Sequence, residues 1–184
     1  MVSEDIVANR DRYLAIMHGH ATMPPEAIIE SLRETQSELL AIFGSAGEAL
    51  AGHKAAPDEW SLHELALHAW FTERLIAKLV HHMARGVVPP AEDLEGAGIG
   101  MFPVGDTRTY SQVVAGLRQQ NEDMLDALRG LPGTPDMDMK LPHPYFGPLS
   151  CLEWAGFQRV HDLDHIQHAR KILASVPTRD EGSS

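Results

Sequence analysis

Apolar side chains recur every three or four positions through four long segments of the chain, a spacing that is typical of amphipathic helices. Runs of alternating β-branched residues, which favour strands, are missing. The pattern predicts an all-α four-helix bundle preceded by a short extra helix. The predicted elements are the short helix at 4–17 and the long helices at 25–50, 61–85, 109–129 and 150–174.

The starts of these helices have recognisable signals. Ser61 with Glu64, and Ser150 with Glu153, have the spacing of a capping box, in which each side chain accepts a hydrogen bond from the other residue's backbone. Ser3 is the expected cap of the short helix, which we expect to pack on the outside of the bundle. Its apolar residues are Ile6, Tyr13, Leu14 and Met17.

Two connections are longer than those that usually join the helices of a bundle. They cover 86–108, which is rich in Gly and Pro, and 130–149. Connections of this length either cross the bundle lengthwise or cover a functional opening. We expect a single domain at 1–177 and a polar tail at 178–184, because little after Pro177 can pack.

Composition narrows the function classes. The chain has 184 residues, a formal net charge of −11 and a single cysteine, Cys151, which excludes a disulfide framework within the chain. The negative charge argues against nucleic-acid and anionic-membrane partners, and no apolar run is long enough to span a bilayer. Because the first residues lack the basic and apolar regions of a secretory signal, we expect a cytoplasmic protein.

Histidines lie on the inward-facing stripes of two predicted helices. His161 and His165 are four positions apart, so both imidazoles reach one point beside the last helix, and His168 continues the same stripe. His68 lies in an apolar stripe of the second helix. Together, His68, His161 and His165 would provide three neutral nitrogen ligands to a divalent ion and leave positions open for water or substrate. A chance cluster of core histidines is the alternative, because the chain has 11 of them.

Three carboxylates near these histidines have more than one interpretation. Glu64 is expected in the capping box, with support of the metal-binding histidine one turn later as the alternative. Asp162 and Asp164 are expected on the solvated surface, because neighbouring residues of a helix point apart. Ion pairs with Arg159 or Lys171 are the alternative for these two aspartates.

Two further segments are candidates for chemistry. The stiff stretch 141–148 places His143 and Tyr145 either in a rigid connector or at the rim of the metal site. Cys151 is either a small buried side chain or a thiol activated by its position at the start of a helix.

The segments PDEWSLHELALHAW and HPYFGPLSCLEWAGFQRVHDLDHIQHARKI resemble the DinB-like superfamily, and the resemblance extends over about 25–173. In that family a Trp-Ser start of the second helix precedes a metal-binding His, and the fourth helix carries a His-x-x-x-His pair with a nearby Gln. The resemblance implies an up-down-down-up bundle in which His68, His161 and His165 are the metal ligands, and Gln167 takes the place of the family's Gln.

Two features depart from the family pattern. His168 is an additional imidazole beside the expected ligands, where it would be a fourth ligand, a supporting group or a general base. Of these we expect a catalytic role. The Gly-rich insert at 96–105 has no counterpart, so the substrate specificity of a relative is not transferable to this chain.

Several groups of the superfamily are metal-dependent thiol transferases or isomerases that use bacillithiol, mycothiol or glutathione. The resemblance therefore implies a Zn-, Ni- or Fe-dependent S-transferase in which a low-molecular-weight thiol attacks a small-molecule electrophile; three imidazoles also suit Cu. A metal-dependent hydrolase and a metal- or ligand-binding protein without turnover remain alternatives. A homodimer is compatible with the resemblance.

Overall fold

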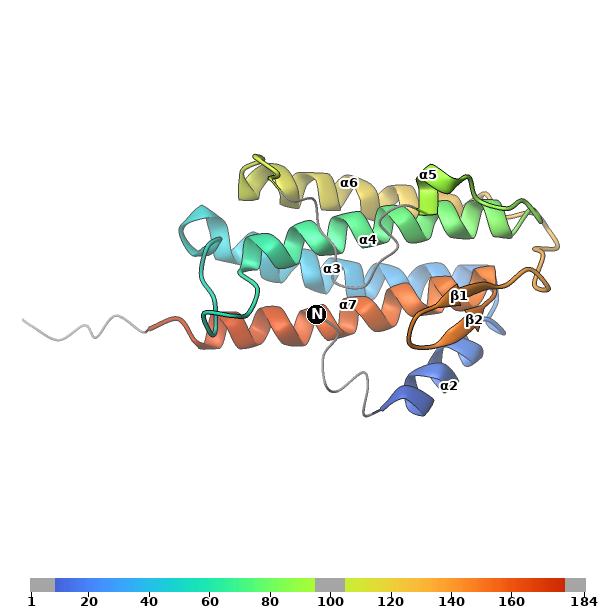
Figure 1. The fold of residues 1–184 in the computed structure, drawn as a ribbon, viewed down its shortest axis with the longest axis horizontal. Coiled ribbons are helices and arrows are strands. Elements are labelled where there is room, and N and C mark those ends of the chain that lie inside the picture. The colour runs from blue at the N-terminus through green and yellow to red at the C-terminus, as the bar shows by residue number, and fades with distance from the viewer. Residues whose placement is uncertain (1–8, 95–104, 178–184) are drawn as a thin grey trace, which may run out of the picture.

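Four long helices lie side by side in the computed structural model, which describes residues 9–94 and 105–177 (Figure 1). They are α3 (Pro25–Leu50), α4 (Leu62–Met83), α6 (Tyr110–Arg129) and α7 (Cys151–Ala174). The shorter helix α2 (Arg10–His20) packs on α7, and α5 (Ala91–Leu94) packs on α4. The predicted all-α four-helix bundle is confirmed, and the predicted tail at 178–184 lies outside the described residues.

The helices follow each other in up-down-down-up order. The colours of Figure 1 show α4 and α6 running in one direction and α3 and α7 running in the other. Helices α6 and α7 each pack against both α3 and α4, whereas α3 and α4 lie diagonally across the bundle. Because α4 and α6 are parallel, the end of α4 and the start of α6 lie at opposite ends of the bundle, a distance that the number of residues between them can span.

Side chains at the helix starts accept hydrogen bonds from backbone N–H groups that have no partner within the helix. The Ser61 hydroxyl accepts from the Glu64 N–H at 3.2 Å, and the Glu64 carboxylate accepts from the Ser61 N–H at 2.7 Å. At the start of α7, the Glu153 carboxylate accepts from the Ser150 N–H at 2.7 Å. These contacts explain why the sequence predicted the starts of α4 and α7 so closely.

The short N-terminal helix ends later than predicted. Helix α2 spans Arg10–His20, so it passes the predicted end at residue 17, and residues 4–8 of the prediction lie outside the described residues, together with the expected cap Ser3. The helix continues past Met17 because a single glycine, Gly19, weakens a helix without ending it, and it ends shortly before the proline pair at the start of α3. Tyr13 and Met17 are buried against the bundle, as their place on the apolar face predicted.

Gly156 marks a close approach of α2 to α7. A Cβ atom at this position would lie 3.0 Å from the Cα and 3.2 Å from the carbonyl oxygen of Met17. We expect Gly156→Ala to lower the free energy of unfolding, because overpacking costs roughly 1–3 kcal/mol and outweighs the gain of about 1 kcal/mol that alanine brings to a helix interior. Urea unfolding measures the change. Gly44→Ala is the matched control and is expected to be stabilising, since a Cβ there meets nothing within 4 Å; equal shifts in both variants would contradict the close approach.

A small β-hairpin in the connection 130–149 is absent from the predicted elements. Its antiparallel strands are β1 (Leu141–His143) and β2 (Gly147–Leu149). The sequence did not reveal them because three-residue strands that contain proline lack the alternation by which strands are recognised. Gly147 has a φ of 81°, which side chains disfavour, and Phe146 in the turn is buried against the bundle.

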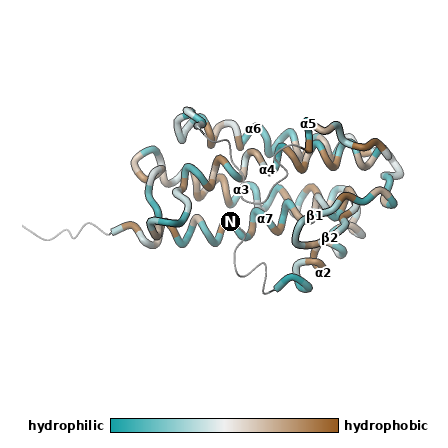
Figure 2. Tube along the Cα trace, viewed as in Figure 1, coloured by the Kyte–Doolittle hydropathy of each residue, from teal (hydrophilic) through white to brown (hydrophobic). Residues whose placement is uncertain are grey.

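Apolar side chains fill both ends of the bundle. Figure 2 shows hydrophobic and hydrophilic residues mixed along each long helix, as expected for amphipathic helices. One buried apolar cluster, with Met17, Leu32 and Phe157, lies toward α2 and the hairpin, and another, with Phe43, Leu65 and Ile166, lies toward the opposite end. Among the described residues, no helix is both long enough and apolar enough to cross a membrane.

Candidate metal centre

Three imidazoles meet inside the bundle, between α4 and α7. The Nε2 atom of His161 lies 3.0 Å from Nε2 of His68 and 3.0 Å from Nε2 of His165. All three side chains are buried, with exposed fractions of 6%, 7% and 2% for His68, His161 and His165. The structure therefore brings together the three residues that the sequence singled out, and no other such group of potential ligands occurs in the described ranges.

The surrounding elements hold these rings in place. His161 and His165 are one helical turn apart on α7, and α4 packs beside α7, so His68 faces them across the helix pair. The Trp60 ring lies 4.8 Å from the ring of His68, and the Phe157 ring lies 5.6 Å from that of His161. Aromatic walls on two sides limit the access of water to the nitrogen atoms.

Burial keeps the imidazoles neutral. It lowers the pKa of both His161 and His165 well below the usual value, and the neighbouring imidazoles lower it further because two positive charges would repel each other. At neutral pH each of these rings therefore has one proton and one lone pair. A neutral ring nitrogen with a free lone pair is the form in which histidine binds a metal.

The arrangement of the ring nitrogens fits a divalent metal ion. A neutral imidazole nitrogen has either a proton or a lone pair, so Nε2 of His161 satisfies only one of its two neighbours through a hydrogen bond. A cation between the rings satisfies all three lone pairs at once. Tetrahedral zinc, with Zn–N bonds of about 2.0–2.1 Å, separates its nitrogen ligands by about 3.3 Å, close to the spacing observed here.

The second ring nitrogen of these imidazoles, Nδ1, has few hydrogen-bond partners. The Nδ1 atoms of His161 and His165 are buried without a hydrogen-bond partner in the described part of the chain, although the Asp164 carboxylate lies 3.7 Å from Nδ1 of His165. Nδ1 of His68 lies 3.4 Å from the Thr72 hydroxyl. Such outer contacts orient metal-binding imidazoles, so Thr72 is placed to orient the His68 ring.

His168 and Gln167 lie outside the triad. The His168 ring is half-buried and stacks on Trp60 with the ring centres 6.2 Å apart, and burial lowers its pKa. Gln167 is exposed. The structure therefore places His168 next to the ring that covers His68, at the edge of the site.

Glu64 and Cys151 have structural roles: Glu64 caps α4, and Cys151 is a small buried side chain. The Glu64 carboxylate is held by the cap and by Lys54, whose Nζ lies 3.0 Å away. Cys151 is buried, and burial raises the pKa of its thiol to about 11, so the thiol is not activated by the helix start.

The expectation that Asp162 lies on the solvated surface is wrong. Its side chain is buried, with an exposed fraction of 2%, and it accepts hydrogen bonds from Gln158 at 2.8 Å and from the Thr35 hydroxyl at 3.3 Å. Helix α7 is covered by α3, α4, α2 and the hairpin, so the residue that follows the buried His161 also points into protein. Burial raises the pKa of Asp162 to about 7.

Glu73 is a buried carboxyl group that sequence analysis missed. Its exposed fraction is 1%, and the Gln36 amide donates to it at 2.5 Å. The Asn121 amide, in its donating orientation, lies 2.5 Å from the other oxygen. Burial, followed by repulsion from Asp162, raises the pKa of Glu73 well above the usual value. This polar layer of Glu73, Asp162 and their partners separates the two apolar clusters of the core.

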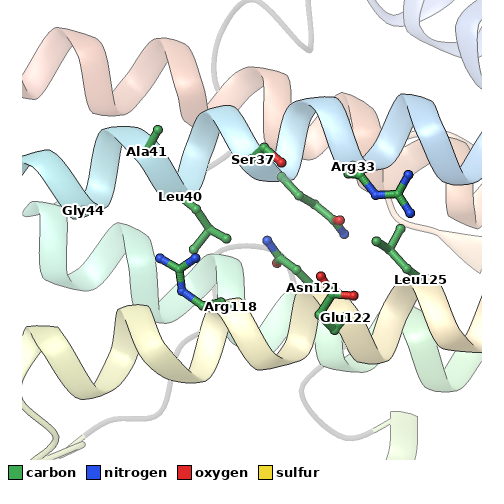
Figure 3. Close-up of a pocket in the computed structure, with 10 residues that line it drawn as sticks. Arg33, Ser37, Leu40, Ala41, Gly44, Arg118, Asn121, Glu122 and Leu125 are labelled. Atoms are coloured by element: carbon green, nitrogen blue, oxygen red, sulfur yellow. The ribbon is translucent and has the colours of Figure 1, made fainter.

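A groove between α3 and α6 opens on the side of the bundle away from α4 and α7. It has a volume of about 410 Å³, and Arg33, Arg118, Asn121 and Glu122 are among the residues that line it (Figure 3). None of the three imidazoles lines this groove. It is therefore separate from the candidate metal centre.

The sequence of the chain matches a known family across most of its length. Residues 31–169 match the DinB superfamily. The chain belongs to the DinB superfamily. Comparison with curated proteins gave no significant match.

Two crystal structures share the fold of this DinB-superfamily chain. A four-helix bundle protein named TT2238 has a TM-score of 0.58 and 18% sequence identity, over 80% of this chain and 98% of the other. A mutant of a mycothiol-dependent maleylpyruvate isomerase has a TM-score of 0.62 and 13% identity, over 85% of this chain and 62% of the isomerase. At these identities the likeness shows the bundle fold alone.

Proposed function

We propose that this chain is a metal-dependent enzyme that transfers a low-molecular-weight thiol to a small electrophilic molecule. The observation that carries the proposal is the convergence of three buried ring nitrogens from His68, His161 and His165 at separations that suit a divalent ion. The fold shared with a mycothiol-dependent maleylpyruvate isomerase supports the choice of a thiol as the co-substrate. Zn, Ni and Fe are the candidate ions, because all accept imidazole ligands.

The residues of the site have separate tasks in this proposal. A bound divalent ion supplies deprotonation of a coordinated thiol at neutral pH, which makes the sulfur nucleophilic. His68, His161 and His165 hold the ion through Nε2 and, being only three, leave coordination positions free. Trp60 and Phe157 exclude water from one side of each ring that they contact.

His168 is proposed as the general base that takes the thiol proton. Its lowered pKa leaves the ring uncharged and able to accept a proton, and its stacking on Trp60 places it at the edge of the site. We expect His168→Phe to keep the stacking and the metal content while kcat falls by about 10²–10⁴-fold, the usual contribution of a positioned base. Steady-state kinetics with metal analysis of the same sample checks this, and an unchanged kcat would remove His168 from the mechanism.

Metal analysis of the purified protein, followed by a panel of thiols with a generic electrophile, tests the proposed function. Turnover that requires both metal and a thiol supports it. Turnover of an ester or amide without thiol would instead indicate a hydrolase, in which metal-bound water is the nucleophile. Bound metal without turnover on any member of the panel would indicate a binding protein. The cytoplasmic location and the homodimer stay predictions.

A further inference from the structure

The hairpin fixes the protonation pattern of one more imidazole. The Nδ1 atom of His143, in β1, faces the backbone N–H groups of Tyr145 at 3.2 Å and Phe146 at 3.3 Å, and both donate to it. An atom that accepts these bonds has no proton, so the single proton of the neutral ring lies on Nε2. Both N–H groups of the hairpin turn contact Nδ1, so neither of them contacts Nε2.

The ring of His143 lies against the face of α7 that carries the candidate ligands. Its centre is 4.4 Å from the Phe157 ring and 5.3 Å from the Trp154 ring, and Phe157 in turn contacts His161. A charge on His143 would reach His161, whose pKa it lowers. Because the two nitrogens lie on opposite edges of an imidazole, the edge with Nε2 faces away from the hairpin turn.

His143 is suited to donate a hydrogen bond without losing its proton. Burial lowers its pKa to about 4, so the ring remains neutral at physiological pH. A neutral imidazole with its proton on Nε2 stabilises negative charge on an oxygen atom and keeps that proton. The fixed tautomer is pre-organised, since the hairpin backbone sets it before any ligand binds.

We infer that His143 is a catalytic residue that donates from Nε2 to the carbonyl oxygen of a conjugated electrophile, which narrows the substrate class to α,β-unsaturated carbonyl compounds. The inference rests on the proposed thiol transfer. The thiolate sulfur forms a bond to the β-carbon, the carbon–carbon π pair shifts, and the carbonyl oxygen gains the negative charge that Nε2–H stabilises. A proton from solvent then adds to the α-carbon, and the thioether leaves as product.

Two substitutions test the donor edge and the acceptor edge of the His143 ring separately. His143→Asn keeps an acceptor near the position of Nδ1 for the hairpin N–H groups but removes the distant donor, whereas His143→Gln places an amide N–H near Nε2. Tyr145→Phe is the matched control, because its exposed side chain changes while its backbone donor remains.

The two substrates for this test are methyl vinyl ketone, whose oxygen gains charge, and benzyl chloride, in which the electron pair leaves with chloride. For the ketone, we expect His143→Asn to lower kcat/KM by about 10²–10³-fold, as for loss of an oxyanion donor, and His143→Gln to restore most of it. For benzyl chloride, and for Tyr145→Phe, we expect changes below about threefold. Equal losses with both substrates would overturn the inference, because they would indicate a structural role.

Nitrogen NMR of the imidazole gives a readout that does not need turnover. At pH 7 we expect the proton of His143 on Nε2, and a proton on Nδ1 would overturn the inference whatever the kinetics show. A metal-loaded wild type that transfers thiol to neither substrate would overturn the proposed function itself. Active wild type with unaffected His143 variants would overturn only the role of His143.

Discussion

Replacing His161 with alanine is expected to abolish tight metal binding and thiol transfer while the bundle stays folded. His161 is the central member of the triad, because its Nε2 lies 3.0 Å from the Nε2 atoms of both His68 and His165. Without it, two imidazoles remain and the ion loses a direct ligand. Loss of a supporting contact alone costs 10–100-fold in metal affinity, so removal of a ligand is expected to cost more than about 100-fold.

Metal content per chain and a thermal unfolding curve measure this prediction together. His81→Ala is the matched control. His81 lies in the last turn of α4, one of the two helices that carry the triad, but its side chain is exposed and is not part of the triad. Full metal content is expected in this control. Full metal content in His161→Ala as well would contradict the assignment of the ligands.

The second large effect concerns the polar layer, where Glu73→Ala is expected to destabilise the protein by roughly 3–5 kcal/mol. The substitution leaves the amides of Gln36 and Asn121 buried without their acceptor and opens a cavity beside them. An unsatisfied buried polar group costs about 1–3 kcal/mol, and two such groups plus a cavity account for the expected total. Urea unfolding at pH 7 measures it.

Glu73→Gln is the control, because a carboxamide keeps the shape of a protonated carboxyl and one acceptor oxygen, with an NH2 donor in place of the hydroxyl. The pKa of Glu73 is raised by burial, so the folded state keeps a proton that the unfolded chain loses above its ordinary pKa of 4.5. The free energy of unfolding of the wild type therefore falls as the pH rises from about 4.5 through the raised pKa of Glu73 in the folded state. Glu73→Gln has no such proton, so its stability relative to the wild type should increase with pH. Parallel pH profiles would contradict a protonated Glu73.

The sequence alone determined the features that depend on residues close together in the chain. Helical periodicity placed the four long helices, and the capping pair of Ser61 and Glu64 located the start of α4. The spacing of His161 and His165 placed both on one face of α7 for the same reason, since residues four apart in a helix are neighbours whatever surrounds them.

Only the tertiary structure decided what depends on packing between distant segments. His68 meets the pair on α7 because α4 packs beside it, a contact that the family resemblance implied but no local pattern encodes. Asp162 is buried because α7 is covered on several sides, and His143 has a fixed tautomer because a hairpin too short for sequence patterns bends two N–H groups onto it. Helix periodicity specifies which residues share a face, whereas burial is set by which elements cover that face.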